Sequence, residues 1–514
     1  MDNSEPFNIT ILSEMVDFPI TDLTSMARAI RTLGERLVPN SAAKSAKITE
    51  KLSLPSILSL LQYGNDDLSD ATSTLIQRLL EPLPVSVILS QFKDWINEGL
   101  TSESDQLKAL ALSVWVNREH DINSLQLILN TYGTQLLDCI ANTESPKVAQ
   151  LAIKPFVASA NDESTLSIIL SPPTIDSIHK LFSRGAIVKT RVLDLLIQMA
   201  SVSKSTYLKL KESNLFSNID SCIDSDDLLL KLNTLEILVS ASGSHLGKSF
   251  LDDFNFQQKI WNNLENHPTN MTPESLESLC YCAELKFIAQ SWKLYPVDNE
   301  LSTLIIKKLE YSLQDKFNND IKEAAVYSYG IIGGTPAGMI ALNKQKTSLR
   351  KFVRFSRSTV DRLKVECLRT FALMMGSKKS PSDESSELIE SLIALYNLLA
   401  ENGNMPGEFV KLAQNPIEPI KIASYDFLFN LSSYHWGIKE LVDSSVFMKF
   451  LFNRSLDSTY LGMKMKYKIV GTILANHDKP SPILDEKLIE QFKNYLSQGE
   501  FYSESVPEVA TQNL

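Results

Sequence analysis

The sequence is poor in the features that mark strand-rich, disulfide-linked or membrane-spanning proteins. It has 18 glycines and 5 cysteines in 514 residues. So few glycines disfavour an all-β fold, which needs many tight turns. A sparse, odd set of cysteines forms no disulfide framework. The longest apolar runs, such as Leu166–Leu170, are far too short to cross a bilayer. The first residues are acidic and polar, unlike a signal peptide, so we expect a protein of the cytoplasm and also of the nucleus.

The chain also lacks an excess of positive charge. Its 50 Lys and Arg stand against 61 Asp and Glu, which gives a net charge of −11. A chain of this sign has no overall attraction for nucleic acid or for an anionic membrane. We therefore expect neither as a partner.

Helical periodicity is present almost everywhere. Apolar residues recur at three- and four-residue spacing, and segments such as 21–38, 67–80 and 416–433 each have the pattern of one amphipathic helix. Asp67, and either Asn318 or Asn319, stand where a helix N-cap is expected. The sequence predicts an all-α fold.

The helices repeat with a period of about 42 residues, a length typical of armadillo-like or HEAT-like units. Seventeen residues after the apolar position that opens the long helix stand Gly247, Gly338 and Gly437. A helix must stop there in a close-packed or left-handed turn. The apolar-Lys pairs that open the long helices are Leu107-Lys108, Val188-Lys189, Leu230-Lys231, Ile321-Lys322, Leu363-Lys364, Ile420-Lys421 and Met463-Lys464.

We therefore predict a right-handed α-solenoid of armadillo/HEAT-like repeats. It extends over residues 1–497 as a single domain, with an inserted surface loop at 377–387 where the spacing exceeds one period. Residues 498–514 form a flexible acidic tail. We expect the protein to be monomeric on its own.

A solenoid offers an elongated face for binding. Positions 3, 6 and 10 after the opening apolar residue form one stripe along each long helix. In armadillo folds this helix lines the concave groove, so we predict that members of the stripe contact a protein partner; the alternative is a solvated face without a partner. The predicted contacts are Arg191, Asp194, Gln198, Asn233, Glu236, Arg369, Asp426 and Asn430. The remaining members are Ser240, Glu366, Leu373 and Ala423.

One segment is strongly basic. Residues 344–369 hold nine Lys and Arg against Asp361 and Glu366, and Arg350, Arg354 and Arg357 fall on one helical face. Three interpretations are open: a dock for an acidic protein surface, a solvated face, or a nucleic-acid site. The neighbouring repeats are acidic or mixed, which argues against the continuous basic stripe that nucleic acid requires.

No segment has the pattern of a catalytic, cofactor or metal site. Residues 243–249 resemble a phosphate-binding loop, but three residues instead of four separate the glycines, and the loop joins two helices. Cys280 and Cys282 form a close pair without the two further ligands that zinc requires. We expect no enzyme, no cofactor and no metal.

Several segments resemble the 26S proteasome non-ATPase regulatory subunit 5 family. The similarity is specific in the last third of the chain and looser near the start. The segments that carry it are Tyr329–Leu342, Ala423–Asn476, Tyr495–Tyr502, Pro55–Leu61 and Gln77–Leu80.

The resemblance implies an assembly chaperone for the base of the proteasome regulatory particle. Such a protein would bind the C-terminal domain of a base AAA ATPase subunit, hold an intermediate that includes a large non-ATPase scaffold, and leave before the mature particle forms. The alternatives are a generic armadillo-type scaffold or adaptor outside the proteasome, and a permanent proteasome subunit. An armadillo-type nuclear import adaptor, which grips a basic signal peptide with Trp and an Asn four residues later on successive helices, is disfavoured, because none of the five tryptophans here has an Asn at that spacing.

Overall fold

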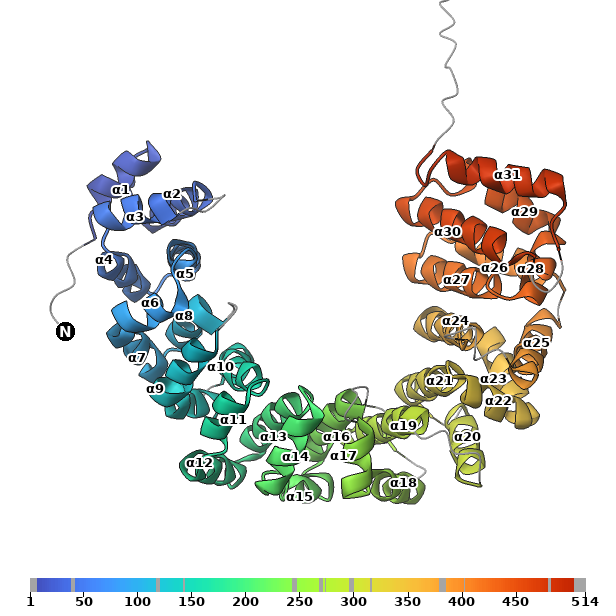
Figure 1. Cartoon of the computed structure of the whole chain (residues 1–514), viewed down its shortest axis with the longest axis horizontal. Coiled ribbons are helices and arrows are strands. Elements are labelled where there is room, and N and C mark those ends of the chain that lie inside the picture. The colour runs from blue at the N-terminus through green and yellow to red at the C-terminus, as the bar shows by residue number, and fades with distance from the viewer. Residues whose placement is uncertain are drawn as a thin grey trace, which may run out of the picture. The chain divides into compact units, whose positions relative to one another are not determined.

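The computed structural model describes residues 7–37, 42–116, 121–141, 144–242, 247–267, 271–272, 274–294, 300–314, 317–378, 385–401, 403–478 and 482–502. Within these ranges the regular structure is helical throughout and contains no strand, which confirms the all-α prediction. The chain divides into two compact units, residues 1–230 and 231–514 (Figure 1). Parts of the predicted loop (379–384) and tail (503–514) lie outside the described residues. The prediction of one single domain over 1–497 stays a prediction.

In the first unit, five helices pack on one another in chain order and form the first layer of the repeats. They are α2 (Leu23–Glu35), α5 (Asp66–Leu80), α8 (Asp105–Val116), α10 (Pro146–Ser159) and α13 (Ala186–Ala200). The other helices of this unit form a second layer, and most of them pack against the first. They are α1 (Ile9–Val16), α3 (Ala42–Lys51), α4 (Leu54–Ser59), α6 (Val85–Gln91), α7 (Lys93–Thr101), α9 (Ile122–Ala141), α11 (Glu163–Ile169), α12 (Pro172–Phe182), α14 (Lys204–Glu212) and α15 (Ile219–Ile223).

The second unit repeats this arrangement, and α16 (Leu228–Ser242) carries the boundary between the units. Its first layer consists of α19 (Leu276–Leu294), α21 (Asn319–Gly333), α24 (Asp361–Met375), α27 (Glu418–Leu431) and α30 (Tyr460–Asn476). The other helices are α17 (Gly247–Phe254), α18 (Phe256–Asn266), α20 (Glu300–Ser312), α22 (Pro336–Lys344), α23 (Lys346–Ser358), α25 (Ser386–Ala400), α26 (Met405–Ala413), α28 (His435–Val442), α29 (Ser445–Phe452) and α31 (Glu486–Ser497).

Hydrogen bonds between neighbouring repeats follow the predicted period. In the second unit the Ser328 hydroxyl donates to the carbonyl oxygen of Leu285 at 3.2 Å, and the Thr370 hydroxyl to that of Val326 at 3.0 Å. In the first unit Gln77 Nε2 donates to Ser113 Oγ at 2.8 Å across 36 residues. The repeat therefore extends to the part of the chain before residue 107, where the sequence pattern is weak.

Close packing requires glycine at two of the predicted repeat positions, Gly338 and Gly437. A Cβ atom on Gly338 would lie 1.9 Å from the carbonyl oxygen of Ile332, and one on Gly437 would lie 2.2 Å from that of Leu431. Neither glycine is among the residues with positive φ. Helices α22 and α28 therefore begin against the end of the preceding helix, at a distance that only glycine allows.

The predicted N-caps are partly confirmed. The side chain of Asn318 accepts a hydrogen bond from the Ile321 amide at 2.9 Å and caps α21. The prediction for Asp67 is wrong, because Asn65 caps α5 by accepting from the Leu68 amide at 2.9 Å. Asp67 instead lies in the first turn, where a carboxylate favours the positive end of the helix dipole.

Candidate partner-binding surface

The stripe predicted on the first layer is partly engaged within the protein. On α13, Arg191 Nη1 donates to the carbonyl oxygen of Ile140 at the end of α9, at 3.0 Å. Burial lowers the pKa of Arg191, although the arginine stays charged near neutral pH. Gln198 is exposed and donates to Asp194 Oδ2 at 2.9 Å. Half-buried Asp194 and exposed Gln198 thus form a polar edge, and Arg191 joins two repeats.

In the second unit the stripe runs over α16, α24 and α27. Glu236 on α16 and Arg369 on α24 are exposed, and Asn233 is half-buried. Arg369 pairs with Glu366 one turn earlier on its own helix. Asp426 on α27 is half-buried, and burial raises the pKa of its carboxyl, an effect that nearby Lys468 opposes. The three helices α16, α24 and α27 therefore each present at least one charged or polar group.

Two stripe positions have structural roles instead. Asn430 Nδ2 donates to the carbonyl oxygen of Ala372 at 2.8 Å and caps the end of α24. Its amide lies over Gly376, where a Cβ atom would come within 2.7 Å of Nδ2. Ala423 is buried, with 1% of its surface exposed. Leu373, by contrast, is exposed at 45% and places an apolar side chain on the stripe.

The basic segment is partly neutralised by acids from other helices. Arg362 Nη2 lies 2.7 Å from Glu323 Oε1, and Lys344 Nζ lies 3.5 Å from Glu387 Oε1. Lys351 pairs with Glu310. A count of charges along the sequence misses this, because each acid lies about one repeat away.

Arg350, Arg354 and Arg357 lie on α23, as predicted from their spacing, but they are not equivalent. Arg357 lies 3.4 Å from Glu401 and donates from Nη2 to the carbonyl oxygen of Leu398 at 2.7 Å. Arg350 and Arg354 are exposed and have no ion pair or hydrogen bond among the described residues. Two of the three predicted arginines thus remain available to a partner.

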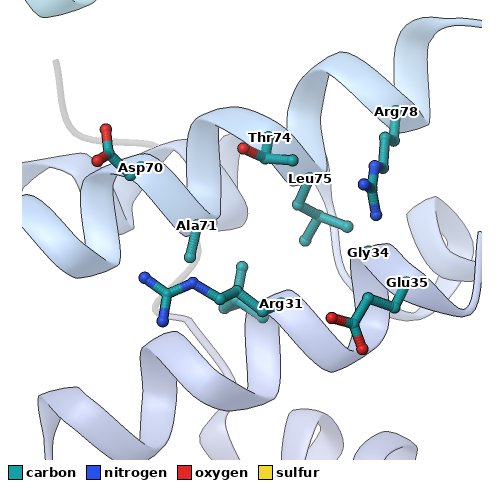
Figure 2. A pocket seen from close by; sticks show the side chains of 9 residues that line it. Arg31, Gly34, Glu35, Asp70, Ala71, Thr74, Leu75 and Arg78 are labelled. Atoms are coloured by element: carbon teal, nitrogen blue, oxygen red, sulfur yellow. The ribbon is translucent and has the colours of Figure 1, made fainter. Parts of the chain in front are cut away.

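A small hollow lies between α2 and α5 in the first unit. Its volume is about 250 Å³, and Figure 2 shows Arg78 of α5 pointing toward Gly34 of α2, with Leu75 beside it on the same helix. Arg31 at its rim pairs with Asp67. The hollow falls below the roughly 300–1,000 Å³ of most small-molecule sites. Its charges are mixed, so it does not favour a cofactor site.

The described residues hold no cluster of the kind that binds a metal ion, and their cysteines are not activated. No cluster of three or more His, Cys, Asp or Glu side chains in this part of the chain could hold a metal ion. All five cysteines are buried, and burial raises the thiol pKa of Cys280 to about 11 and that of Cys282 to about 12. Near neutral pH these thiols are therefore protonated and poor nucleophiles. No helix in the described ranges is long and apolar enough to span a membrane.

The structure also shows buried charges that the sequence analysis did not find. Glu284 on α19 is completely buried beside Lys231 and His267. Lys466 on α30 is completely buried and donates to the carbonyl oxygen of Asn453 at 2.9 Å. Each lies at a position where the 3.6-residue pattern predicts an apolar side chain. A charged residue at such a position is the sequence feature by which these buried charges could have been found.

Taken together, the two-layer repeats and the polar stripe define a helical-repeat scaffold whose surface is suited to binding another protein. The chain belongs to the proteasome non-ATPase 26S subunit family, whose model matches residues 13–513. The 26S proteasome non-ATPase regulatory subunit 5 of Bos taurus is 20% identical over 512 residues, which cover 95% of this chain and 98% of that protein. The Drosophila melanogaster protein of the same name is 21% identical, covering 87% of this chain and 86% of that protein.

Solved structures support the fold. The yeast importin-beta structure matches with a TM-score of 0.56 and 13% identity, over 95% of this chain and 66% of that chain. The Kap95:Nup1 complex matches with a TM-score of 0.59 and 13% identity, over 95% of this chain and 65% of that chain. At this identity the likeness concerns the α-solenoid architecture alone, and it confirms that prediction.

Proposed function

We propose that this protein is an assembly chaperone for the base of the 26S proteasome regulatory particle. In this proposal it binds the C-terminal domain of a base AAA ATPase subunit, together with the large non-ATPase scaffold of an early intermediate. It leaves before the mature particle forms. It acts as a monomer in the cytoplasm and nucleus, without catalysis or a cofactor. The observation that carries the proposal is the family match over residues 13–513.

The first-layer stripe is the proposed contact surface. Asp194 and Gln198 in the first unit, and Glu236, Arg369 and Asp426 in the second, provide charged and polar groups on α13, α16, α24 and α27. Leu373 adds an exposed apolar side chain beside them. Interfaces combine apolar contacts with charges that steer association and set specificity. A helical protein domain with complementary charges would therefore find several contacts along each unit.

An affinity pull-down from cell lysate tests the proposal. Tagged full-length protein should recover base ATPase subunits, identified by mass spectrometry, with little peptidase activity of the 20S core. Abundant core peptidase activity would indicate a permanent subunit instead. Recovery of other proteins without any base ATPase would favour the alternative of a generic scaffold outside the proteasome. The isolated C-terminal domain of the recovered ATPase should then bind the purified protein directly.

A further inference from the structure

Helix α23 has an unusually basic solvent face. Its 13 residues, Lys346–Ser358, contain five Lys and Arg and no Asp or Glu. The opposite face is apolar, with Leu349, Phe352 and Val353 buried against the unit. The cations are therefore confined to one side of the helix, which points away from the core.

Two of the five cations on α23 have an acidic partner, and Lys346, Arg350 and Arg354 have none among the described residues. Lys351 pairs with Glu310 of α20, and Arg357 pairs with Glu401 after α25. Arg350 and Arg354 lie between these two pairs on the helix surface and are exposed. They make no ion pair or hydrogen bond with any residue that the structure describes. At i and i+4, their Cβ atoms are about 5–6 Å apart.

The adjacent helix α20 extends this basic patch on one side. Gln345 Nε2 donates to Thr303 Oγ1 at 3.1 Å, which aligns α20 and α23 in a register of 42 residues. This register places Lys308 level with Arg350, and exposed Lys307 one residue before it, level with Leu349. On the other side, α25 carries the exposed acids Glu387 and Glu390. The patch is thus short, and acidic residues end it.

We propose that Arg350 and Arg354, with Lys307 beside them, bind a short acidic segment of a partner protein that carries two or more Asp or Glu residues. Two exposed guanidinium groups can each form a paired hydrogen bond with a carboxylate. On a chain with a net charge of −11, an unneutralised basic patch attracts such a segment locally. Nucleic acid is disfavoured because the acids of α25 interrupt the basic surface within one repeat.

This surface is separate from the proposed ATPase contact, which lies on the first-layer helices, and the inference does not depend on that proposal. Helix α23 belongs to the second layer and packs on α20, α22, α24 and α25. A partner on α23 could therefore be bound by the protein alone or by the protein in its proposed complex.

Binding of a fluorescein-labelled octaglutamate peptide to the full-length protein, followed by fluorescence anisotropy, tests this site. Binding should be measurable at low ionic strength and should weaken steeply between about 50 and about 300 mM NaCl, because salt screens exposed charges. The double variant Arg350→Glu/Arg354→Glu should lose at least about tenfold in affinity. Its melting temperature should stay unchanged, because both arginines are exposed and neither forms an ion pair or hydrogen bond with a described residue. Arg350→Lys/Arg354→Lys should bind with intermediate affinity, since lysine keeps the charge without the paired geometry.

A matched control is Lys439→Glu/Lys449→Glu, which makes the same charge change at exposed positions on α28 and α29. This variant should bind the peptide like the unmodified protein. The proposal is overturned if the unmodified protein does not bind octaglutamate, or if both double variants lose affinity equally. Binding of an oligothymidylate of the same charge as tightly as the peptide would instead assign the patch to nucleic acid.

Discussion

Glu284 Oε1 lies 3.2 Å from the Nζ atom of Lys231, inside the second unit, with no part of the glutamate exposed. Its other oxygen lies 2.9 Å from His267 Nε2. Neither oxygen accepts a hydrogen bond of normal geometry among the described residues, so the attraction is mainly electrostatic. This contact joins α16, α19 and the end of α18, which are otherwise held by apolar packing.

Removing one partner of this pair should destabilise the second unit strongly. Lys231→Met leaves a buried carboxylate without its lysine, and the expected loss is about 3–5 kcal/mol of unfolding free energy. The double variant Lys231→Met/Glu284→Met removes both charges and should lose less than the two single variants together. Denaturant titration of the single variants Lys231→Met and Glu284→Met and of the double variant measures these losses. Additive losses would show that the two side chains do not interact.

The repeat glycines give a prediction based on steric contact. Gly338→Ala and Gly437→Ala each place a Cβ atom against a carbonyl oxygen, at 1.9 and 2.2 Å in the present structure. The helices must move apart, at a cost of about 1–3 kcal/mol or more. Gly471→Ala on α30 is the control, because nothing lies within 4 Å of its Cβ position. It should leave stability unchanged or raise it by up to about 1 kcal/mol. Equal effects at all three positions would contradict the packing argument.

The fold could be predicted because its signals are local and repeated. The apolar-Lys pairs and the glycines before α22 and α28 recur at fixed spacing, and each repeat packs against its neighbours. The cap of α5 was misplaced by two residues, because Asn65 and Asp67 are both good capping residues.

The candidate surface was predicted less well, because charge pairing between repeats is not local. Along the sequence the basic segment holds nine Lys and Arg residues and two acids. In the structure Glu310, Glu323 and Glu387 pair with it from other helices. Each of these acids lies 39 to 43 residues from its cation, which is close to the period itself. Comparing equivalent positions of neighbouring repeats would have revealed them. Nothing comparable in the sequence indicates that Asn430 caps a helix 58 residues away.

Lys466 gives a prediction for the pH dependence of stability. Burial lowers its pKa to about 8, and Arg454 and Lys421 lower it too, while Asp457 opposes them. The unfolded chain titrates near the ordinary value of 10.5, so between these values the folded chain binds fewer protons. Stability should therefore rise as pH increases through 8. The contribution of Lys466 should grow by about 2 kcal/mol between about pH 7 and about pH 9.5.

The variant Lys466→Met removes this titration. The difference in unfolding free energy between the unmodified protein and Lys466→Met should shift by that amount, in favour of the unmodified protein, as pH rises. Lys493→Met, at an exposed position on α31, is the control and should show no such shift. Denaturant titrations at several pH values measure both differences. A constant difference for Lys466→Met would mean that its charge is not penalised in the folded state.

Charge reversal on the first-layer stripe tests the proposed ATPase contact. The triple variant Asp194→Lys/Glu236→Lys/Asp426→Lys should weaken binding of the ATPase C-terminal domain by about tenfold or more, because opposite charges across an interface become like charges. Glu236 is exposed, and half-buried Asp194 accepts one hydrogen bond, from exposed Gln198 on the same helix, so their replacement should leave the fold intact. Asp426 is half-buried, so its replacement also affects stability. The double variant Asp194→Lys/Glu236→Lys, which keeps Asp426, separates the effect on binding from the effect on stability. Isothermal titration calorimetry measures the affinity.

The matched control is Glu418→Lys/Glu486→Lys/Glu490→Lys, which changes the net charge equally at exposed positions outside the stripe. If long-range attraction alone governed binding, both triple variants would weaken it to the same degree, and the loss would disappear at high salt. A stripe in direct contact instead predicts a loss that is specific to the first variant and persists when salt screens distant charges. Unchanged affinity of the first variant would place the ATPase site on another surface of the solenoid.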